Sequence, residues 1–161
     1  MNEIEIKLPD NSIRKIERGS SGGDVAKIIG EGLFRASIAA KVDGDIVDLE
    51  MPIDQDANIE ILTNKDPESH EILLHSTAHL LAQAVKELYP VAKIAIGPAL
   101  QDRFYYDIDI DIPLNENELL VIERKMKEIA KRNLSVYRLE LKRNEAINKF
   151  KNLGEDYKVE I

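Results

Sequence analysis

The alternation of apolar and polar residues predicts a small sheet in the first third of the chain. Residues 3–8 place every second side chain on one face, which is the period of a half-buried strand. After a polar turn, residues 13–16 can return as a second strand. Two more strands flank Asp43-Gly44, a pair that suits the positive φ of a tight hairpin, and residues 57–63 alternate again.

One short helix is expected to interrupt these strands. Residues 24–29, DVAKII, have the apolar spacing of a helix, and Gly30 and Gly32 are expected to end it. The predicted order is β-β-α-β-β-β, which fits a β-grasp sheet packed on one helix. The expected fold class is therefore α+β, with a β-grasp domain at residues 1–63 and a second, α/β-mixed domain at 64–161.

A long helix is expected to open the second domain. Asp66 is a candidate N-cap and Pro67 suits the first helical position, and Pro90 stops the helix after Leu88. On a wheel of about 100° per residue, its apolar side chains spread over roughly 200°, more than the stripe of a surface helix. This helix must therefore be covered on more than one side.

Shorter elements are predicted beyond that helix. The predicted strands are 93–96, 103–112, 135–141 and 157–161, and the predicted helices are 115–132 and 144–154. Asn115 with Glu118 resembles a capping pair. The chain stops within an alternating segment, so we expect it to be a piece of a longer protein.

Composition indicates a folded protein without disulfides. Hydrophobic residues make up 43% and charged residues 32% of the 161 residues, which is ordinary for a globular protein. No apolar run approaches the ~18 residues that a membrane span needs, and no signal peptide opens the chain, so we expect a cytoplasmic protein without a membrane partner. Because cysteine is absent, an internal metal would need histidine and carboxylate ligands.

The charge is unevenly distributed along the chain. The net charge of −8 argues against gripping nucleic acid by bulk electrostatics. Residues 123–151 nevertheless contain ten Lys or Arg against four Asp or Glu. This segment is either a pair of solvated helical faces or a surface that faces RNA.

Two histidines one helical turn apart form the candidate site. Residues four apart on a helix have Cβ atoms about 5 to 6 Å apart, so His75 and His79 can converge on one water, ion or substrate atom. They share a narrow polar stripe with Gln83 and Lys86, at the margin of the apolar face. Acid/base catalysis suits their near-neutral pKa, and metal binding and a purely structural role are the alternatives.

Metal binding is the weakest of these alternatives for this chain alone. Zinc proteases need His-Glu-x-x-His, in which the glutamate is the general base, and residue 76 is serine. Two histidines also leave zinc short of its usual three or four protein ligands. The third histidine, His70, points elsewhere on the helical wheel.

Several stretches taken together resemble the N-terminal region of bacterial-type threonyl-tRNA synthetases. They are the β-grasp pattern, HSTAHLLAQAVKELYP, IGPALQDRFYYDID and GEDYKVEI, in that order, and they cover essentially the whole chain. The resemblance implies that residues 1–63 are a TGS domain, which has a ubiquitin-like fold. It implies that residues 64–161 are the first part of the editing domain shared with alanyl-tRNA synthetases, incomplete at its C-terminal end.

The resemblance also implies a function. The family attaches threonine to tRNA(Thr) with ATP and must reject serine, whose missing methyl group provides only about 1 to 3 kcal/mol of discrimination. A second pocket therefore hydrolyses seryl-tRNA(Thr). In this sequence the family's catalytic editing residues match His75, His79 and Lys158, and a substrate-binding aromatic residue matches Tyr106. Tyr106 can also be a core residue, because it shares a strand face with its apolar neighbours.

The rest of the family's machinery is expected to lie outside these residues. The resemblance places there a second editing motif with a cysteine and a histidine, the ATP- and Mg²⁺-dependent core, its threonine-binding Zn²⁺ and the homodimer contact. The fragment alone is therefore expected to bind no cofactor, to lack a complete editing pocket and to be inactive. The partners implied are the acceptor end of tRNA(Thr) and, for the full-length enzyme, threonine and ATP.

A function of another class competes with this one. The chain can instead be a non-catalytic RNA- or protein-binding module, in which a β-grasp domain is joined to an α/β domain. In that hypothesis the two histidines have a structural role only.

Overall fold

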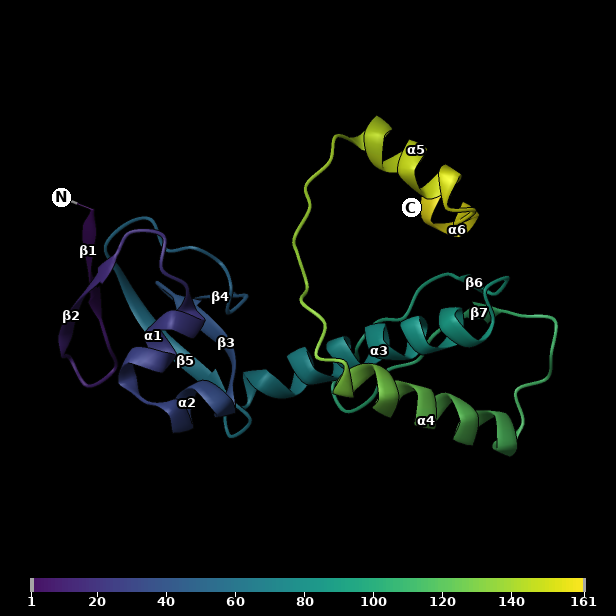
Figure 1. Ribbon diagram of the computed structural model, residues 1–161, viewed down its shortest axis with the longest axis horizontal. Helices are drawn as coiled ribbons and strands as arrows, with labels where there is room; N and C mark the ends of the chain where they lie inside the picture. The colour runs from purple at the N-terminus through teal and green to yellow at the C-terminus, as the bar shows by residue number, and fades with distance from the viewer. Residues whose placement is uncertain (1, 161) are drawn as a thin grey trace. The chain divides into compact units, whose positions relative to one another are not determined.

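The computed structural model describes residues 2–160, which fall into two compact units (Figure 1). The first unit comprises Met1–Ile72 and the second Leu73–Ile161. The division falls inside a long helix, α3 (Glu68–Leu88). The boundary that the sequence predicts, between residues 63 and 64, stays a prediction.

Five strands form the sheet of the first unit. They are β1 (Glu3–Lys7), β2 (Ile13–Glu17), β3 (Ser37–Val42), β4 (Asp45–Val47) and β5 (Ala57–Thr63). The order across the sheet is β2-β1-β5-β3-β4, in which β1 and β5 are parallel and the other neighbours antiparallel (Figure 1). This mixed sheet, with helices packed on it, confirms the predicted α+β class and β-grasp architecture.

The core of this unit follows from the alternation along its strands. In β1, Ile4 and Ile6 are buried and the residues between them are exposed. They pack in one apolar cluster with side chains from β2, the first helix and β5, among them Ile16, Val25 and Ile59. The hairpin between β3 and β4 turns at Asp43 and Gly44 with φ of 51° and 95°, as predicted for this pair.

The first unit has one helix more than predicted. Helix α1 (Gly22–Ile29) begins at a capping box formed by Ser21 and Asp24 and ends at Gly30, as expected. A second helix, α2 (Glu31–Ala36), follows immediately, so the predicted stop at Gly32 is wrong. Glycine costs a helix only about 1 kcal/mol relative to alanine, which a short helix can tolerate.

Helices dominate the second unit. The elements are the remainder of α3, β6 (Lys93–Ile94), β7 (Ile108–Asp109), α4 (Glu116–Lys131), α5 (Arg143–Asn152) and α6 (Asp156–Glu160). Asn115 caps α4 by accepting from the backbone N–H groups of residues 117 and 118. The Glu118 carboxylate accepts from the Tyr89 hydroxyl instead of completing a capping box. Asp66 likewise turns away from α3 and accepts from the Thr63 N–H and hydroxyl.

Helix α3 is covered from two directions, as the width of its apolar face requires. Its buried residues Ala84 and Val85 join one cluster with Ile122 and Ile129 of α4 on one side and with Ile94 of β6 on the other (Figure 1). The long helix therefore serves as the centre of the second core. Within residues 2–160 no helix, α3 included, is long and apolar enough to cross a membrane.

Three predicted strands differ from the structure. Within residues 103–112 only β7 pairs with a strand, although Phe104 also forms an isolated bridge with Ala99. Residues 135–141 are exposed and form no strand, because no described strand lies alongside to pair with them. The last predicted strand is helix α6, apart from residue 161, which lies outside the described residues.

Ion pairing and hydrogen bonding explain why the last segment is helical despite its alternation. The Asp156 carboxylate lies 3.0 Å from Lys93 Nζ on β6, and the Tyr157 hydroxyl donates to Asp109 of β7 at 2.9 Å. These contacts suit a single helical turn packed across the two short strands. Tertiary contacts thus override the local pattern here.

Two isoleucines of the first unit test its core. Ile59 is 1% exposed and Ile13 is 63% exposed. Replacing Ile59 with alanine is expected to lower the free energy of unfolding by about 2 to 5 kcal/mol, because it leaves a cavity in the core. Ile13→Ala, the matched control, should change it by less than about 0.5 kcal/mol. Urea unfolding followed by amide NMR signals of β1 and β5 measures both, and equal effects would contradict this core.

Candidate functional site

The two candidate histidines lie beside each other on α3. Their ring centroids are 4.3 Å apart and the rings meet edge to face at 64°. Both side chains are exposed, and both project from one face of the helix because they are four residues apart. The pair can therefore contact one small group from the solvent.

A cavity of about 440 Å³ opens beside this pair in the second unit. It is lined by His79, Ala82, Gln83, Lys86, Ile94, Tyr106, Phe150 and Lys158. Helix α3 forms one wall, β6 and the segment before β7 form another, and α5 and α6 supply the last two residues. Three of the four residues predicted for the site thus meet at one cavity, and the fourth, His75, contacts His79 beside it.

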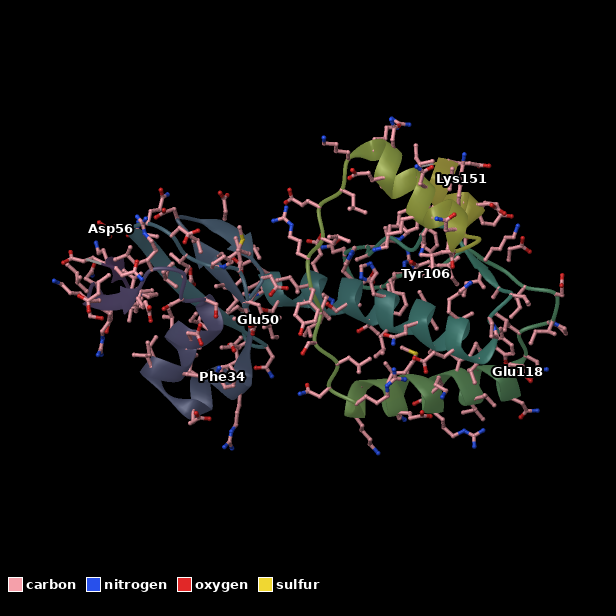
Figure 2. The ribbon with its side chains drawn as sticks, turned by 45° about the horizontal axis from the view of Figure 1, so that its top comes forward. Phe34, Glu50, Asp56, Tyr106, Glu118 and Lys151 are labelled. Carbon is pink, nitrogen blue, oxygen red and sulfur yellow. The ribbon has the colours of Figure 1, made fainter. Side chains whose placement is uncertain are left out.

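Tyr106 has a dual position, partly in the core and partly at the cavity. Its ring packs with the cluster around α3 and also lines the cavity (labelled in Figure 2). Burial raises the pKa of its hydroxyl. The ring lies against Gly97, where any added Cβ would overlap it. Gly97 is therefore required for this placement of the aromatic wall.

The pKa of His79 is lowered. Partial desolvation of the ring where it borders the cavity is the largest cause, followed by the charges of His75 and Lys158. A lowered pKa keeps the imidazole neutral at pH 7. A neutral imidazole can accept a proton from a water or a hydroxyl, which is the property that general-base catalysis needs.

The two lysines of the cavity differ in their partners. Lys86 Nζ donates to the carbonyls of Pro90 and Ala92 and lies 2.9 Å from a carboxylate oxygen of Glu155. Lys158 Nζ lies 5.8 Å from the centroid of the Phe150 ring, and no carboxylate of residues 2–160 lies within ion-pair distance of it. Lys158 is therefore the lysine whose charge is available to a ligand.

Some residues that line the cavity were not predicted as site residues from the sequence. Gln83 and Lys86 lie in the polar stripe of the histidines, so their spacing on the helix already indicated this side of α3. Phe150 has no such signal, because its position depends on the turn that joins α5 to α6. Its ring forms part of the wall beside Lys158.

No metal site forms among the described residues. Within residues 2–160, no three His, Asp or Glu side chains gather closely enough to hold a metal ion. The family resemblance places its zinc outside this part of the chain.

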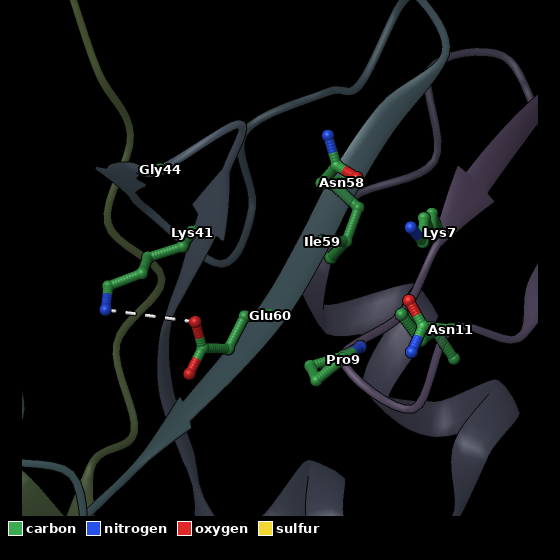
Figure 3. Close-up of a pocket in the computed structure, with 9 residues that line it drawn as sticks. Lys7, Pro9, Asn11, Lys41, Gly44, Asn58, Ile59 and Glu60 are labelled. Carbon is green, nitrogen blue, oxygen red and sulfur yellow. Dashed lines mark ion pairs between the residues drawn. The ribbon is translucent and has the colours of Figure 1, made fainter.

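A second hollow lies on the sheet of the first unit (Figure 3). It has a volume of about 280 Å³ and is lined by Lys7, Leu8, Pro9, Asn11, Lys41, Gly44, Asn58, Ile59 and Glu60. The Lys41 ammonium lies 3.8 Å from Glu60 (dashed line in Figure 3) and 2.6 Å from Glu68, so carboxylates already compensate its charge. The histidine cavity is the better candidate because its unpaired cation, Lys158, lies beside a neutral base, whereas no histidine lines the hollow on the sheet.

Most of the first unit matches a known domain family. Residues 4–63 match the TGS domain family, and they therefore form a TGS domain. Over all 161 residues the chain is 52% identical to the threonine–tRNA ligase of Geobacter sp. strain M21. It is 49% identical over 158 residues to that of Clostridioides difficile strain 630, and 49% over 156 residues to that of Legionella pneumophila strain Corby.

The similarity concerns one part of these relatives. All or nearly all of the chain aligns, from 97% to 100%, but it spans about a quarter of each relative's length, 24% to 25%. The aligned part is their N-terminal region. The resemblance to threonyl-tRNA synthetases that the sequence indicates is therefore confirmed along the whole chain.

The charge of Lys158 should be measurable in the titration of His79. Replacing Lys158 with methionine is expected to raise the pKa of His79, because a positive charge that disfavours the imidazolium is removed. NMR titration of the histidine ring protons measures this change. Lys149→Met is the matched control, since it removes the same charge from α5 at a position that does not line the cavity. No change with Lys158→Met would refute the placement of this lysine.

Because the pKa of His79 is lowered, the free energy of unfolding depends on pH. His79 titrates near its ordinary value of 6.5 when unfolded and at a lower pH when folded, so the native state binds fewer protons between these values. The free energy of unfolding should fall as pH drops below 6.5 and stay unaffected by this group well above it. In Lys158→Met the fall should be smaller, because the two pKa values lie closer together.

Proposed function

We propose that this chain is the N-terminal part of a threonine–tRNA ligase, and that its second unit belongs to a proofreading site that hydrolyses seryl-tRNA(Thr). The identity of about 50% to such ligases along the whole chain supports the first part. The cavity carries the second part, because it gathers His79, Tyr106 and Lys158 from three separate segments of the chain.

The reaction that we assign to this site is the attack of water on an aminoacyl ester. The water oxygen bonds to the ester carbonyl carbon, and neutral His79 takes the water proton. The ammonium of Lys158 stabilises the negative charge on the carbonyl oxygen. The bond to the terminal ribose oxygen then breaks and that oxygen takes up a proton, which yields free serine and tRNA.

The remaining side chains bind and orient in this proposal. His75 contacts the His79 ring and is placed to orient the water or the ribose hydroxyl. The ring of Tyr106 forms an apolar wall for the aminoacyl group. A cavity of about 440 Å³ lies at the small end of ligand pockets, which suits a group of the size of serine.

Other properties of the full-length enzyme belong to this proposal as well. ATP, Mg²⁺, Zn²⁺ and threonine would bind to the part of the ligase that this chain does not span, and a homodimer would form there. The steps that we assign to the cavity use its own side chains, His79 and Lys158, with His75 and Tyr106 in supporting roles. The cellular setting that we propose is the cytoplasm, where aminoacylated tRNA is used.

The basic residues of the second unit divide into paired and unpaired groups. On α4, Lys125 and Lys127 form ion pairs with Glu128 and Glu123. On α5, Arg143, Lys149 and Lys151 have no carboxylate within ion-pair distance among the described residues (Lys151 is labelled in Figure 2). Because α5 also supplies Phe150 to the cavity, its free charges are the ones placed to contact phosphates of a tRNA acceptor end.

The histidine pair is tested in the full-length ligase. Replacing His75 and His79 with alanine should slow hydrolysis of seryl-tRNA(Thr) by about 10² to 10⁴-fold, because general-base catalysis is lost. Threonylation, measured in parallel, should be unchanged. His70→Ala is the control, since it is an exposed histidine of the same helix that does not line the cavity. Unchanged serine clearance in the double variant would favour the non-catalytic binding module.

The phosphate-contact role of α5 has its own test. Lys149→Ser with Lys151→Ser should weaken binding of a tRNA acceptor duplex and lower the slope of log K against log[salt] by about 0.7 to 0.9 per lost contact. Fluorescence anisotropy at a series of salt concentrations measures the slope. Lys125→Ser with Lys127→Ser changes the net charge equally on α4, where both lysines are ion-paired. Equal slopes for the two double variants would exclude a specific role of α5.

A further inference from the structure

Glu155 is the one charged residue that is buried within residues 2–160. Its exposed fraction is 8%, and the other buried polar residues are serines. It lies in the turn between α5 and α6, directly after Gly154, whose φ of +69° ends α5 in the left-handed region. A carboxylate is costly to bury, so its position calls for a specific compensating arrangement.

Three bonds of Glu155 lead to three residues of the cavity. Its backbone N–H donates to the carbonyl of Phe150 at 3.0 Å, and its carbonyl accepts from the N–H of Lys158 at 3.0 Å. Its carboxylate lies 2.9 Å from Lys86 Nζ on α3. Phe150, Lys158 and Lys86 all line the cavity, whereas Glu155 does not.

The contact with Lys86 also determines which lysine serves the cavity. An ammonium has three N–H donors. Those of Lys86 are used by the carboxylate of Glu155 and by the carbonyls of Pro90 and Ala92, at 3.1 and 2.9 Å. Lys86 is therefore held as a structural cation, although its side chain lies along the cavity.

We propose that Glu155 is a positioning residue of the cavity. Its ion pair with Lys86 fixes the turn between α5 and α6 to α3, and its backbone hydrogen bonds fix Phe150 and Lys158 in the lining of the cavity. The same ion pair withdraws Lys86 from ligands and leaves Lys158 as the cation of the site. The catalytic role of the cavity rests on the proposed function, whereas the positions that Glu155 fixes do not depend on it.

The other contacts of α6 do not provide the same link. Asp156 pairs with Lys93, with side chains 64% and 42% exposed, and exposed pairs of this kind contribute little. The Tyr157 hydroxyl donates to the exposed Asp109. These contacts hold α6 to β6 and β7, but none of the four residues lines the cavity.

A double-mutant cycle on the 161-residue chain tests the proposal. Lys158→Met is made in the natural sequence and in the Glu155→Ala background, and the pKa of His79 is measured by NMR in all four proteins. The other titratable groups around the cavity, His75, Lys86 and Tyr106, are the same in each pair, so their contributions cancel within it. We expect the increase caused by Lys158→Met to disappear, or to fall by more than half, when Glu155 is absent.

A second variant and a control keep the test decisive. Lys86→Met breaks the same ion pair from the other side and should also abolish the ring-current shift that Phe150 imposes on the Lys158 methylene protons. Asp156→Asn removes the neighbouring carboxylate of α6 and should leave both signals in place. If Glu155→Ala does not fold, as judged by amide signal dispersion, Lys86→Met alone decides.

The results have distinct meanings. The proposal is overturned if Lys158→Met raises the pKa of His79 as much in the Glu155→Ala background as in the natural sequence. It is also overturned if the ring-current shift is unchanged in Lys86→Met. Equal losses with Asp156→Asn also overturn it, because any contact of α6 would then suffice. Both measurements are independent of hydrolysis, so a failure of the proposed editing function would leave them valid.

Discussion

The second unit depends on one constraint, the breadth of the apolar face of α3. A helix with apolar side chains over so wide an arc cannot be covered by one neighbour. Helix α4 packs on one side through Ile122 and Ile129, and β6 packs on another through Ile94. The polar stripe of α3 holds His75 and His79, and His79 lines the cavity. The cavity is thus formed at the margin of the core, where apolar packing ends.

Local patterns predicted the first unit well because its elements are specified by neighbouring residues. The alternation of Ile4 and Ile6 indicates both the strand and its buried face, and Asp43-Gly44 indicates the turn. The extra helix α2 was missed because Gly32 was interpreted as a stop signal, although glycine in a helix is only moderately unfavourable.

The second unit was predicted less completely because its short elements depend on long-range contacts. Residues 135–141 alternate but have no described strand to pair with, and Tyr157 belongs to a helix that the carboxylate of Asp109 and the ammonium of Lys93 anchor.

The part of the candidate site that belongs to one helix, α3, could be predicted from the sequence. The four-residue spacing places His75 and His79 together, and the helical wheel includes Gln83 and Lys86. Tyr106 and Lys158 came from the family resemblance, since no periodicity connects them to α3. The partners of each lysine could not be predicted at all. Whether the ammonium of a lysine already has partners within the protein depends on groups such as the Glu155 carboxylate. This carboxylate is 69 residues away from Lys86 in the chain.

The contact between Gly97 and the Tyr106 ring has a consequence for how this wall can vary among proteins of the same fold. A side chain at position 97 would occupy the space of the ring, so a larger residue there requires a smaller one at 106. Among proteins of this fold, the side-chain volumes at positions 97 and 106 should therefore vary in opposite directions. Such an exchange would reshape the wall that faces the bound group while leaving the imidazoles and the ammonium where they are.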